Sequence, residues 1–375
     1  MKKLRILISI VLSIAFLFGI TLIEYVPVQA TVINTSTYVA LGDSITTGYG
    51  LVSFNSKDIK NKSSANNFVN KLSKRLGKKV VNLGVEGIDS TRFLEAIIRP
   101  TTVGQKADVI QIKNAGIITI SIGGNNVMQP LIAILNEKLG KGKTIYNASA
   151  QEIQTVAFGL LFNQTALDKL QTTAQEGASK FTGNVKLKKT GEFASIISTI
   201  KKLNPKAQII VQTIYNPYKS MLTAIIDTAI KSMNAEIIKG SANGKNYKVA
   251  DVYSAFSKAS LGTKLVNADT GTSFDPHPTA KGHDVIYTLV AYAAQNNTLP
   301  YNLKATITKG SLTTKVYEGK LLLTITPTKG YKVPKSILLT IGKGANKTLA
   351  LANGTATVPI ADVGADVVVT GVCTK

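Results

Sequence analysis

Residues 117–126 read Ile-Ile-Thr-Ile-Ser-Ile-Gly-Gly-Asn-Asn, an apolar run that ends in two glycines and two asparagines. A continuous apolar run of this length is typical of a strand that is covered on both faces. Four more runs share this character: Tyr38–Leu41, Lys79–Leu83, Gln208–Ile214 and Tyr247–Val252. Helical patterns separate the runs, and this alternation predicts a parallel sheet in a layered α/β domain.

The pattern changes at two places along the chain. Residues 136–190 are long for a single crossover, so we expect a helical insertion near the strand ends, placed to form a lid or a substrate wall. After Pro300 short alternating segments are separated by Gly, Pro and Asn-Gly signals. We therefore expect an α/β domain over residues 31–299 and a small all-β, sandwich-like accessory module over residues 300–375.

The N-terminus has the three-part layout of a secretory signal. Basic residues at positions 2, 3 and 5 precede the uncharged run Ile6–Ile23, and Val28-Gln29-Ala30 follows. We predict a signal peptide over residues 1–30 that is cleaved after Ala30, with an uncleaved anchor as the alternative. With a single cysteine in the chain, this predicts a secreted or cell-surface protein of a bacterium, most plausibly a Gram-positive one.

Composition narrows the classes of partner and cofactor. The chain of 375 residues carries 44 basic and 21 acidic residues, a net charge of +23, which favours contact with an anionic cell wall or membrane surface. A solvated lysine-rich surface is the alternative interpretation. Dense basic runs interleaved with aromatic residues are missing, so we expect no nucleic-acid partner. One cysteine and two histidines exclude a disulfide framework and a multi-cysteine zinc site.

Four of the predicted strands lead into loops that carry chemically useful groups. Ser44 follows the first strand within Gly-Asp-Ser, and Gly87 follows the second, where its N–H is unobstructed. Asn125 follows the third strand and offers a side-chain amide, while Asp275-Pro276-His277 precedes the last predicted helix. A serine, a histidine with a nearby carboxylate and two N–H donors are the parts of a nucleophilic acyl-transfer site. We predict Ser44, His277 and Asp275 as catalytic, and the Ser44, Gly87 and Asn125 donors as an oxyanion hole.

These four blocks, in this order, resemble the GDSL family, also called SGNH hydrolases, over about residues 37–297. Tyr215-Asn216-Pro217 also resembles lipase-like members of the family. The resemblance implies a flavodoxin-like three-layer α/β/α sandwich with five parallel strands. It further implies hydrolysis of carboxylic esters such as lipids, thioesters and acetylated sugars, with no metal and no organic cofactor.

The chain departs from the family pattern at two positions. The third block usually ends in aspartate, and here Asn126 stands there, so we expect a site without that bracing carboxylate. The last block usually places aspartate three residues before the histidine, where this chain has Phe274. Asp275 is one residue closer and is expected to reach the imidazole through a different turn; a backbone carbonyl is the alternative orienting group.

Three functions fit these features. The first is a secreted serine ester hydrolase that acts on a lipid or other acyl ester, the second a polysaccharide O-acetyl esterase, and the third a non-catalytic surface-binding protein on the same fold. The apolar run 156–162 favours an acyl substrate if it lines an acyl channel, although the same run is equally suited to a core.

Overall fold

A computed structural model describes residues 37–51, 54, 66–184, 189–218, 222–270 and 274–375. Five parallel strands form the central sheet in the order β2-β1-β3-β6-β7, as predicted. Their bounds are Thr37–Gly42 (β1), Lys79–Gly84 (β2), Ile117–Ser121 (β3), Gln208–Gln212 (β6) and Lys248–Ala250 (β7). This is the strand order of flavodoxin-like folds, with the switch point between β1 and β3.

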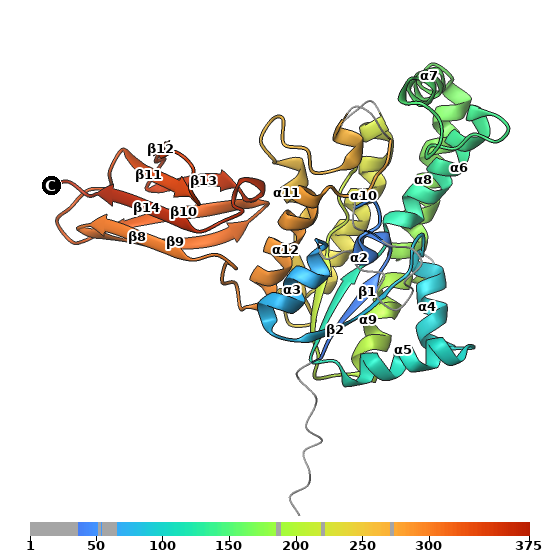
Figure 1. The fold of residues 1–375 in the computed structure, drawn as a ribbon, viewed down its shortest axis with the longest axis horizontal. Helices are drawn as coiled ribbons and strands as arrows, with labels where there is room; N and C mark the ends of the chain where they lie inside the picture. The colour runs from blue at the N-terminus through green and yellow to red at the C-terminus, as the bar shows by residue number, and fades with distance from the viewer. Residues whose placement is uncertain (1–36, 52–53, 55–65, 185–188, 219–221, 271–273) are drawn as a thin grey trace, which may run out of the picture.

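Helices cover both faces of the sheet and complete three layers (Figure 1). Along β1, Val39 and Leu41 are buried on one face, and Tyr38 and Ala40 on the other, because successive side chains of a strand alternate. The first face packs against α4 (Ser90–Ile98), α5 (Val103–Asn114), α6 (Gly124–Leu139), α8 (Gln164–Thr182), α9 (Glu192–Leu203) and α10 (Leu222–Gly240). The second packs against α3 (Phe68–Leu76), α11 (Val252–Ser257) and α12 (Ala280–Ala294).

Most of the segment expected to be a helical insertion is helical. It contains the end of α6, all of α7 (Ala150–Leu161) and α8, and the short pair β4 (Gly183–Asn184) and β5 (Lys189–Thr190). These helices project beyond the sheet edge (Figure 1). The run 156–162 divides between two environments: Ala157 and Leu160 are buried in the core, whereas Phe158 and Phe162 are exposed and pack on each other.

The C-terminal part is all β apart from a short 3-10 turn. Two sheets, β13-β10-β9 and β12-β11-β14-β8, share one buried cluster, so they form a sandwich. The strands are β8 (Leu303–Thr308), β9 (Gly310–Tyr317), β10 (Lys320–Pro327), β11 (Ser336–Ile341), β12 (Lys347–Ala350), β13 (Thr355–Pro359) and β14 (Val367–Val372). The same cluster continues into α12, so the sandwich packs against the α/β part. The predicted boundary at residues 299–300 lies in the connection between α12 and β8.

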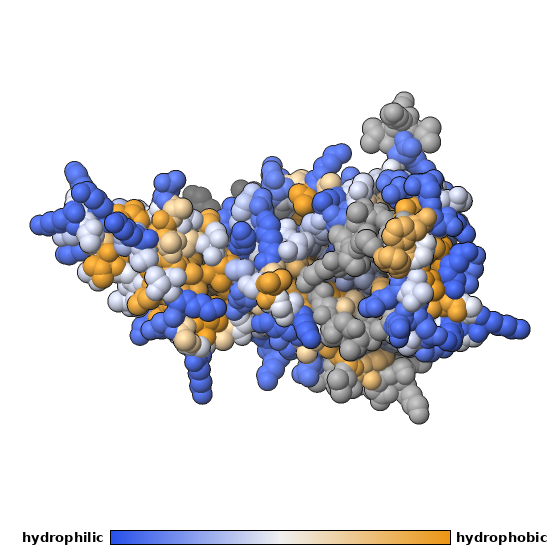
Figure 2. Space-filling view, turned by 90° about the horizontal axis from the view of Figure 1, so that it is seen from above, coloured by the Kyte–Doolittle hydropathy of each residue, from blue (hydrophilic) through white to orange (hydrophobic). Residues whose placement is uncertain are grey.

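Two predictions, export through a signal peptide and contact with an anionic surface, concern the surroundings of the protein. The predicted signal peptide, residues 1–30, lies outside the described residues. Within the described ranges, no helix is both long and apolar enough to cross a membrane. Hydrophilic side chains project along the whole molecule, including the β sandwich (Figure 2), whose residues 300–375 carry ten lysines and only three acidic residues.

Candidate active site

Ser44 lies at the carboxyl end of β1, as the first residue of the short helix α2 (Ser44–Thr47). The turn into this helix requires glycine at position 42. Gly42 has φ of 141°, and a Cβ there would lie 2.1 Å from the Ser121 carbonyl oxygen. Asp43 caps the helix by accepting from the Ile45 N–H at 3.0 Å. The chain therefore presents Ser44 at the switch point of the sheet, where open α/β folds bind ligands.

His277 lies against Ser44, and Asp275 lies against His277. The distance from His277 Nε2 to Ser44 Oγ is 2.9 Å, and His277 Nδ1 is hydrogen-bonded to Asp275 Oδ1. Burial would raise the pKa of Asp275, but hydrogen bonds from the His277 ring, the Asn267 amide and the His277 N–H hold it below its usual value. An ionised Asp275 accepts the Nδ1 proton, which leaves Nε2 free to accept from Ser44. Asp275 thus reaches the ring from one residue closer than the family spacing, and no backbone carbonyl takes its place.

The second histidine takes no part in this hydrogen-bonded series. His283 is fully buried in α12, and its Nδ1 accepts from the Phe68 N–H at 3.4 Å, at the start of α3. Burial lowers the pKa of His283 to about 3, so it stays neutral in ordinary buffers. The sequence predicted that this histidine packs in the helix or caps a neighbouring loop, and its buried contact with the start of α3 agrees with that.

The three predicted oxyanion donors converge on the same site. Ser44, Gly87 and Asn125 all line the cavity beside His277. Within the described residues, neither the Ser44 N–H nor the Gly87 N–H donates to another protein atom. Asn125 donates one amide hydrogen to the Ile88 carbonyl at 3.0 Å, which leaves its second hydrogen for a ligand. Gly87 has φ of 69°, a left-handed conformation that favours glycine.

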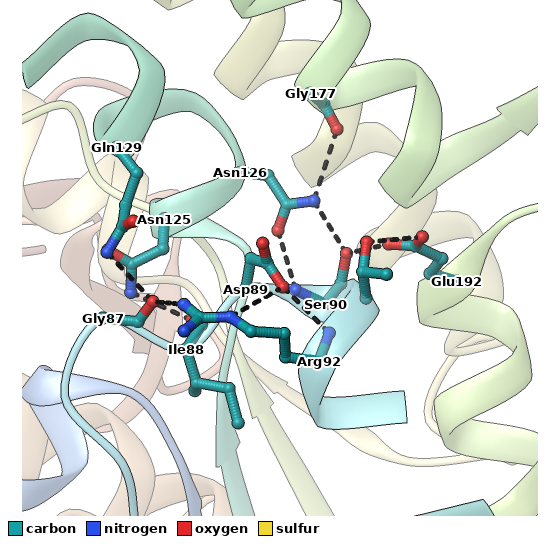
Figure 3. A network of polar contacts seen from close by, with 11 residues as sticks. Gly87, Ile88, Asp89, Ser90, Arg92, Asn125, Asn126, Gln129, Gly177 and Glu192 are labelled. Carbon is teal, nitrogen blue, oxygen red and sulfur yellow. Dashed lines mark hydrogen bonds and ion pairs between the residues drawn. The ribbon is translucent and has the colours of Figure 1, made fainter. Parts of the chain in front are cut away.

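A polar network holds the Gly87 loop against α6 (Figure 3). Asn126 accepts from the Ser90 N–H at 3.0 Å and donates to Ser90 Oγ at 2.7 Å, while Ser90 Oγ donates to Glu192. Thr91 donates to the other Glu192 oxygen at 2.7 Å. The carboxylate that the family has at position 126 is absent, as expected, but a different carboxylate braces the loop. Asn126 is buried and bonded through both amide atoms, and Glu192 on α9 supplies the carboxylate one residue further along the network.

The Gly87 carbonyl is held from two directions. Gln129 on α6 donates to it at 3.0 Å, and the Arg92 guanidinium on α4 donates to it as well. Arg92 is in turn paired with Asp89, the N-cap of α4 (Figure 3). The Gly87 carbonyl shares its peptide plane with the Ile88 N–H, so these two bonds fix that peptide and restrain Gly87 from its carbonyl side. Sequence reasoning missed Glu192, Gln129 and Arg92, because no local motif links them to position 87.

A second carboxyl group lies beside the nucleophile. Asp43 is only 4% exposed, and burial raises its pKa to about 6, although bonds from Ile45 and from Ser121 Oγ at 2.9 Å partly oppose this. Its role in the turn is structural, and its charge state changes within the pH range of ordinary assays. No cluster of three or more metal-ligating side chains occurs among the described residues.

The cavity beside Ser44 has a volume of about 520 Å³ and is open to solvent. One wall is a face of α6, which contributes side chains from Asn125 at its start to Asn136 two to three turns later. The lining includes six aliphatic or methionine side chains, those of Ile122, Met128, Ile132, Ala133, Ile214 and Ile230, next to polar groups such as those of Gln129 and Asn136. None of the described side chains in residues 156–162 lines this cavity, so the run does not form an acyl channel beside Ser44.

Comparisons with known proteins agree with this geometry. The model of the GDSL-like lipase/acylhydrolase family matches residues 40–285. By sequence, no curated protein matches the chain. Among solved structures, an extracellular lipase from Streptomyces rimosus is 18% identical, with a TM-score of 0.45, over 70% of this chain and 100% of the lipase. A phospholipase A1 from Streptomyces albidoflavus is 15% identical, with a TM-score of 0.43, over 70% and 98%.

An acetylxylan esterase from Geobacillus stearothermophilus is similar as well, at 17% identity and a TM-score of 0.38, over 70% of this chain and 93% of the esterase. The family match spans more than half of the chain and includes all four strand-end blocks. The chain therefore belongs to the GDSL-like lipase/acylhydrolase family, also called SGNH hydrolases, whose members are carboxylic ester hydrolases.

Proposed function

We propose that this protein hydrolyses carboxylic esters of acyl chains through an acyl-enzyme on Ser44. The observation that carries the proposal is the hydrogen-bonded series Ser44–His277–Asp275 at the mouth of a largely apolar cavity. His277 Nε2 takes the proton of Ser44 Oγ as the oxygen attacks the ester carbonyl. The tetrahedral oxyanion is held by the Ser44 and Gly87 N–H groups and by the Asn125 amide.

The imidazolium then returns the proton to the leaving alcohol, and the carbon–oxygen bond to that alcohol breaks. Water enters, gives a proton to His277 Nε2 and attacks the acyl-enzyme, which releases the acid and restores Ser44. Asp275 keeps the imidazole in the tautomer that this cycle needs and stabilises the imidazolium.

The cavity favours an acyl chain over an acetyl group. An acetyl group fills little of a space of about 520 Å³, and the apolar wall of α6 would then stay unoccupied. Each methylene that moves from water to an apolar wall contributes about 0.8 kcal/mol, which is roughly fourfold in kcat/KM. We expect kcat/KM to rise from acetate to chains of medium length.

The test is an assay of p-nitrophenyl esters from acetate to palmitate, with acetylated xylan alongside, on residues 31–375 and on the matched Ser44→Ala variant. Turnover that rises with chain length and disappears in Ser44→Ala is the expected result. A strong preference for acetylated xylan would refute the acyl-chain substrate and favour the O-acetyl esterase. No turnover, together with no labelling of Ser44 by a fluorophosphonate, would refute the enzyme and leave a binding protein.

We also propose that the protein is exported and stays close to an anionic cell surface. Support comes from the signal-like residues 1–30 and from the excess of lysine in residues 300–375. N-terminal sequencing of the protein from the culture medium should begin at Thr31. Cell-wall binding by the purified protein should weaken as salt rises, and binding that is indifferent to salt would contradict the charge mechanism.

A further inference from the structure

The segment that carries Asp275 and His277 belongs to no helix or strand and depends on outside donors. It reads Phe274-Asp275-Pro276-His277-Pro278, and its two prolines have no N–H to donate. The segment can therefore be fixed mainly through its carbonyl groups. Each of the four carbonyls from Phe274 to His277 accepts one hydrogen bond.

Along the segment, the four bonds come alternately from a tyrosine hydroxyl and from a backbone amide. Two come from backbone amides: Ala268 N–H donates to the Asp275 carbonyl and Asn267 N–H to the His277 carbonyl, both at 2.9 Å. The other two come from tyrosine hydroxyls. Tyr218 donates to the Phe274 carbonyl at 3.1 Å and Tyr215 to the Pro276 carbonyl at 2.7 Å.

Both tyrosines are well suited to this task. They lie in the loop after β6, one on each side of Asn216-Pro217. The Tyr215 ring packs on Phe256 at 4.7 Å between centroids, and the Tyr218 ring packs on Phe274 at 5.9 Å. Burial raises the pKa of both phenols above the usual value, and the negative charge of Asp275 raises it further, so both keep the proton that they donate.

We propose that Tyr215 and Tyr218 are positioning residues, which hold the two carbonyls on either side of Asp275 and so aim its carboxylate at His277. This inference rests on the proposed function. The Asp275 carboxylate also accepts from the His277 N–H at 3.1 Å and from the Asn267 amide at 2.8 Å. Its direction therefore depends on the path of the backbone that carries Asp275. Without the two hydroxyls, the 274–275 and 276–277 peptides lose these restraints, and only the Ala268 bond still holds the peptide between them. The carboxylate then loses its alignment with Nδ1.

Tyr215→Phe, Tyr218→Phe and the double variant remove only the two hydroxyl oxygens. We expect kcat to fall about tenfold in each single variant and about a hundredfold in the double, with KM within about twofold of wild type, since neither hydroxyl binds substrate. The matched control is Tyr247→Phe. Its hydroxyl donates to the Ile237 carbonyl at 2.6 Å, it is as buried as Tyr218, and it does not line the cavity. This control should lower thermal stability but leave kcat unchanged.

The decisive measurement repeats the substitutions in an Asp275→Ala background. If the hydroxyls act through Asp275, the tyrosine substitutions should change kcat by less than about twofold in this background, because the carboxylate that the hydroxyls position is gone. An equal loss of kcat with and without Asp275 would overturn the proposal. So would a double tyrosine variant that keeps wild-type kcat.

The reaction of Ser44 with a fluorophosphonate in the wild-type protein distinguishes failure of the proposed function from failure of the positioning role. If Ser44 is unreactive, the function fails, and the positioning role is tested by NMR instead. The chain has only two histidines, so the His277 Nδ1–H proton is readily identified by comparison with a His277→Gln variant. Its exchange with water should be faster in the double tyrosine variant than in Tyr247→Phe. Equal exchange rates would overturn the positioning role.

Discussion

Replacing Glu192 by glutamine should loosen the loop that carries Gly87, and a second substitution in the same network should restore it. Glu192 accepts hydrogen bonds from the hydroxyls of Ser90 and Thr91, the first two residues of α4. Glutamine keeps one acceptor oxygen and turns the other into a donor, so one of the two hydroxyls loses its acceptor. A hydrogen bond to a charged group contributes about 1.5–3 kcal/mol, and we expect the free energy of unfolding to fall within that range.

The effect on rate follows from the position of the loop. Removing one oxyanion donor entirely costs about a hundred- to a thousandfold in kcat. The Glu192→Gln variant keeps the Gly87 carbonyl bonded to Gln129 and Arg92, so the N–H is displaced and not lost (Figure 3). We expect kcat to fall about tenfold, with little change in KM.

Asn126→Asp perturbs the same network from the other end. The Ser90 N–H still has its acceptor, but the single Ser90 hydroxyl proton now faces carboxylates at 126 and 192. The Gly177 carbonyl, which Asn126 contacts at 3.4 Å, then faces an oxygen instead of an amide. Two carboxylates that share one proton repel each other. This variant alone should lose at least as much stability as Glu192→Gln.

The double variant Asn126→Asp/Glu192→Gln restores one carboxylate and one amide in exchanged positions. The Ser90 hydroxyl then donates to Asp at 126 and accepts from Gln at 192, so its bonds reverse direction and remain satisfied. We expect the double variant to be more stable than the sum of the singles by about 1 kcal/mol or more, with kcat recovering in parallel. Urea unfolding and p-nitrophenyl ester kinetics on all four proteins measure this. Strictly additive losses in both would refute the network.

Three further predictions test neighbouring parts of the site. Gly87→Ala should lower kcat and reduce the free energy of unfolding, measured in urea, by about 1–2 kcal/mol. The reason is that φ of 69° is unfavourable for alanine and that the new Cβ would lie 2.6 Å from Gln129 Nε2. Full activity would contradict the role of this N–H. The pKa of Asp43 is raised to about 6 in the folded protein, so its contribution to the free energy of unfolding is largest in acid and is lost as pH rises through about 4 to 6. Relative to Asp43→Asn, the wild-type protein should lose stability on the order of 3 kcal/mol between pH 4 and 8. Parallel plots of unfolding free energy against pH for the two proteins would refute the shift. Ala133→Phe should fill the cavity and lower kcat/KM for long esters much more than for acetate, whereas an equal loss for both would show that α6 does not contact the acyl chain.

The parts of the fold that the sequence predicted are those with a local signal. The five strands are continuous apolar runs, and each was predicted within a few residues of its observed bounds. The sequence also predicts helices at 65–76, 90–98, 165–179, 192–203, 221–239 and 280–296, and C-terminal strands at 304–308, 321–326, 336–340, 355–360 and 367–370. Helix α6 was missed because Gly123-Gly124 indicates a turn and Pro130 interrupts the helical pattern, although the helix continues through it. Helix α5 was missed because it has almost no apolar stripe, and Ile112 is its only fully buried residue. Among the β strands, β9 and β12 were missed because both are mostly exposed.

The residues of the site could be predicted from local signals, whereas the residues that hold them in place could not. Ser44, Gly87, Asn125 and His277 each follow or precede a regular element, and a parallel sheet brings the carboxyl ends of its strands to one edge. Their meeting is therefore a consequence of topology. Glu192 is 102 residues from Ser90 in the chain, and Tyr215 is 61 residues from Pro276. Contacts of this kind depend on which helices and loops pack side by side, which no local pattern specifies.

This difference bears on how departures from a family motif should be interpreted. Asn126, the spacing of Asp275 and the basic β module were the sequence features that favoured a binding protein on a hydrolase fold, and the first two concern the active site. At both places the missing element is supplied from a distant part of the chain. Glu192 gives the loop its carboxylate through Ser90, and two tyrosines with the 267–268 backbone hold Asp275 against His277. A motif records only the residues that are near in sequence, whereas the geometry of a site depends on every group that restrains it. The two departures therefore give no support to the loss of catalysis, and a loss would have to be argued from the rate itself.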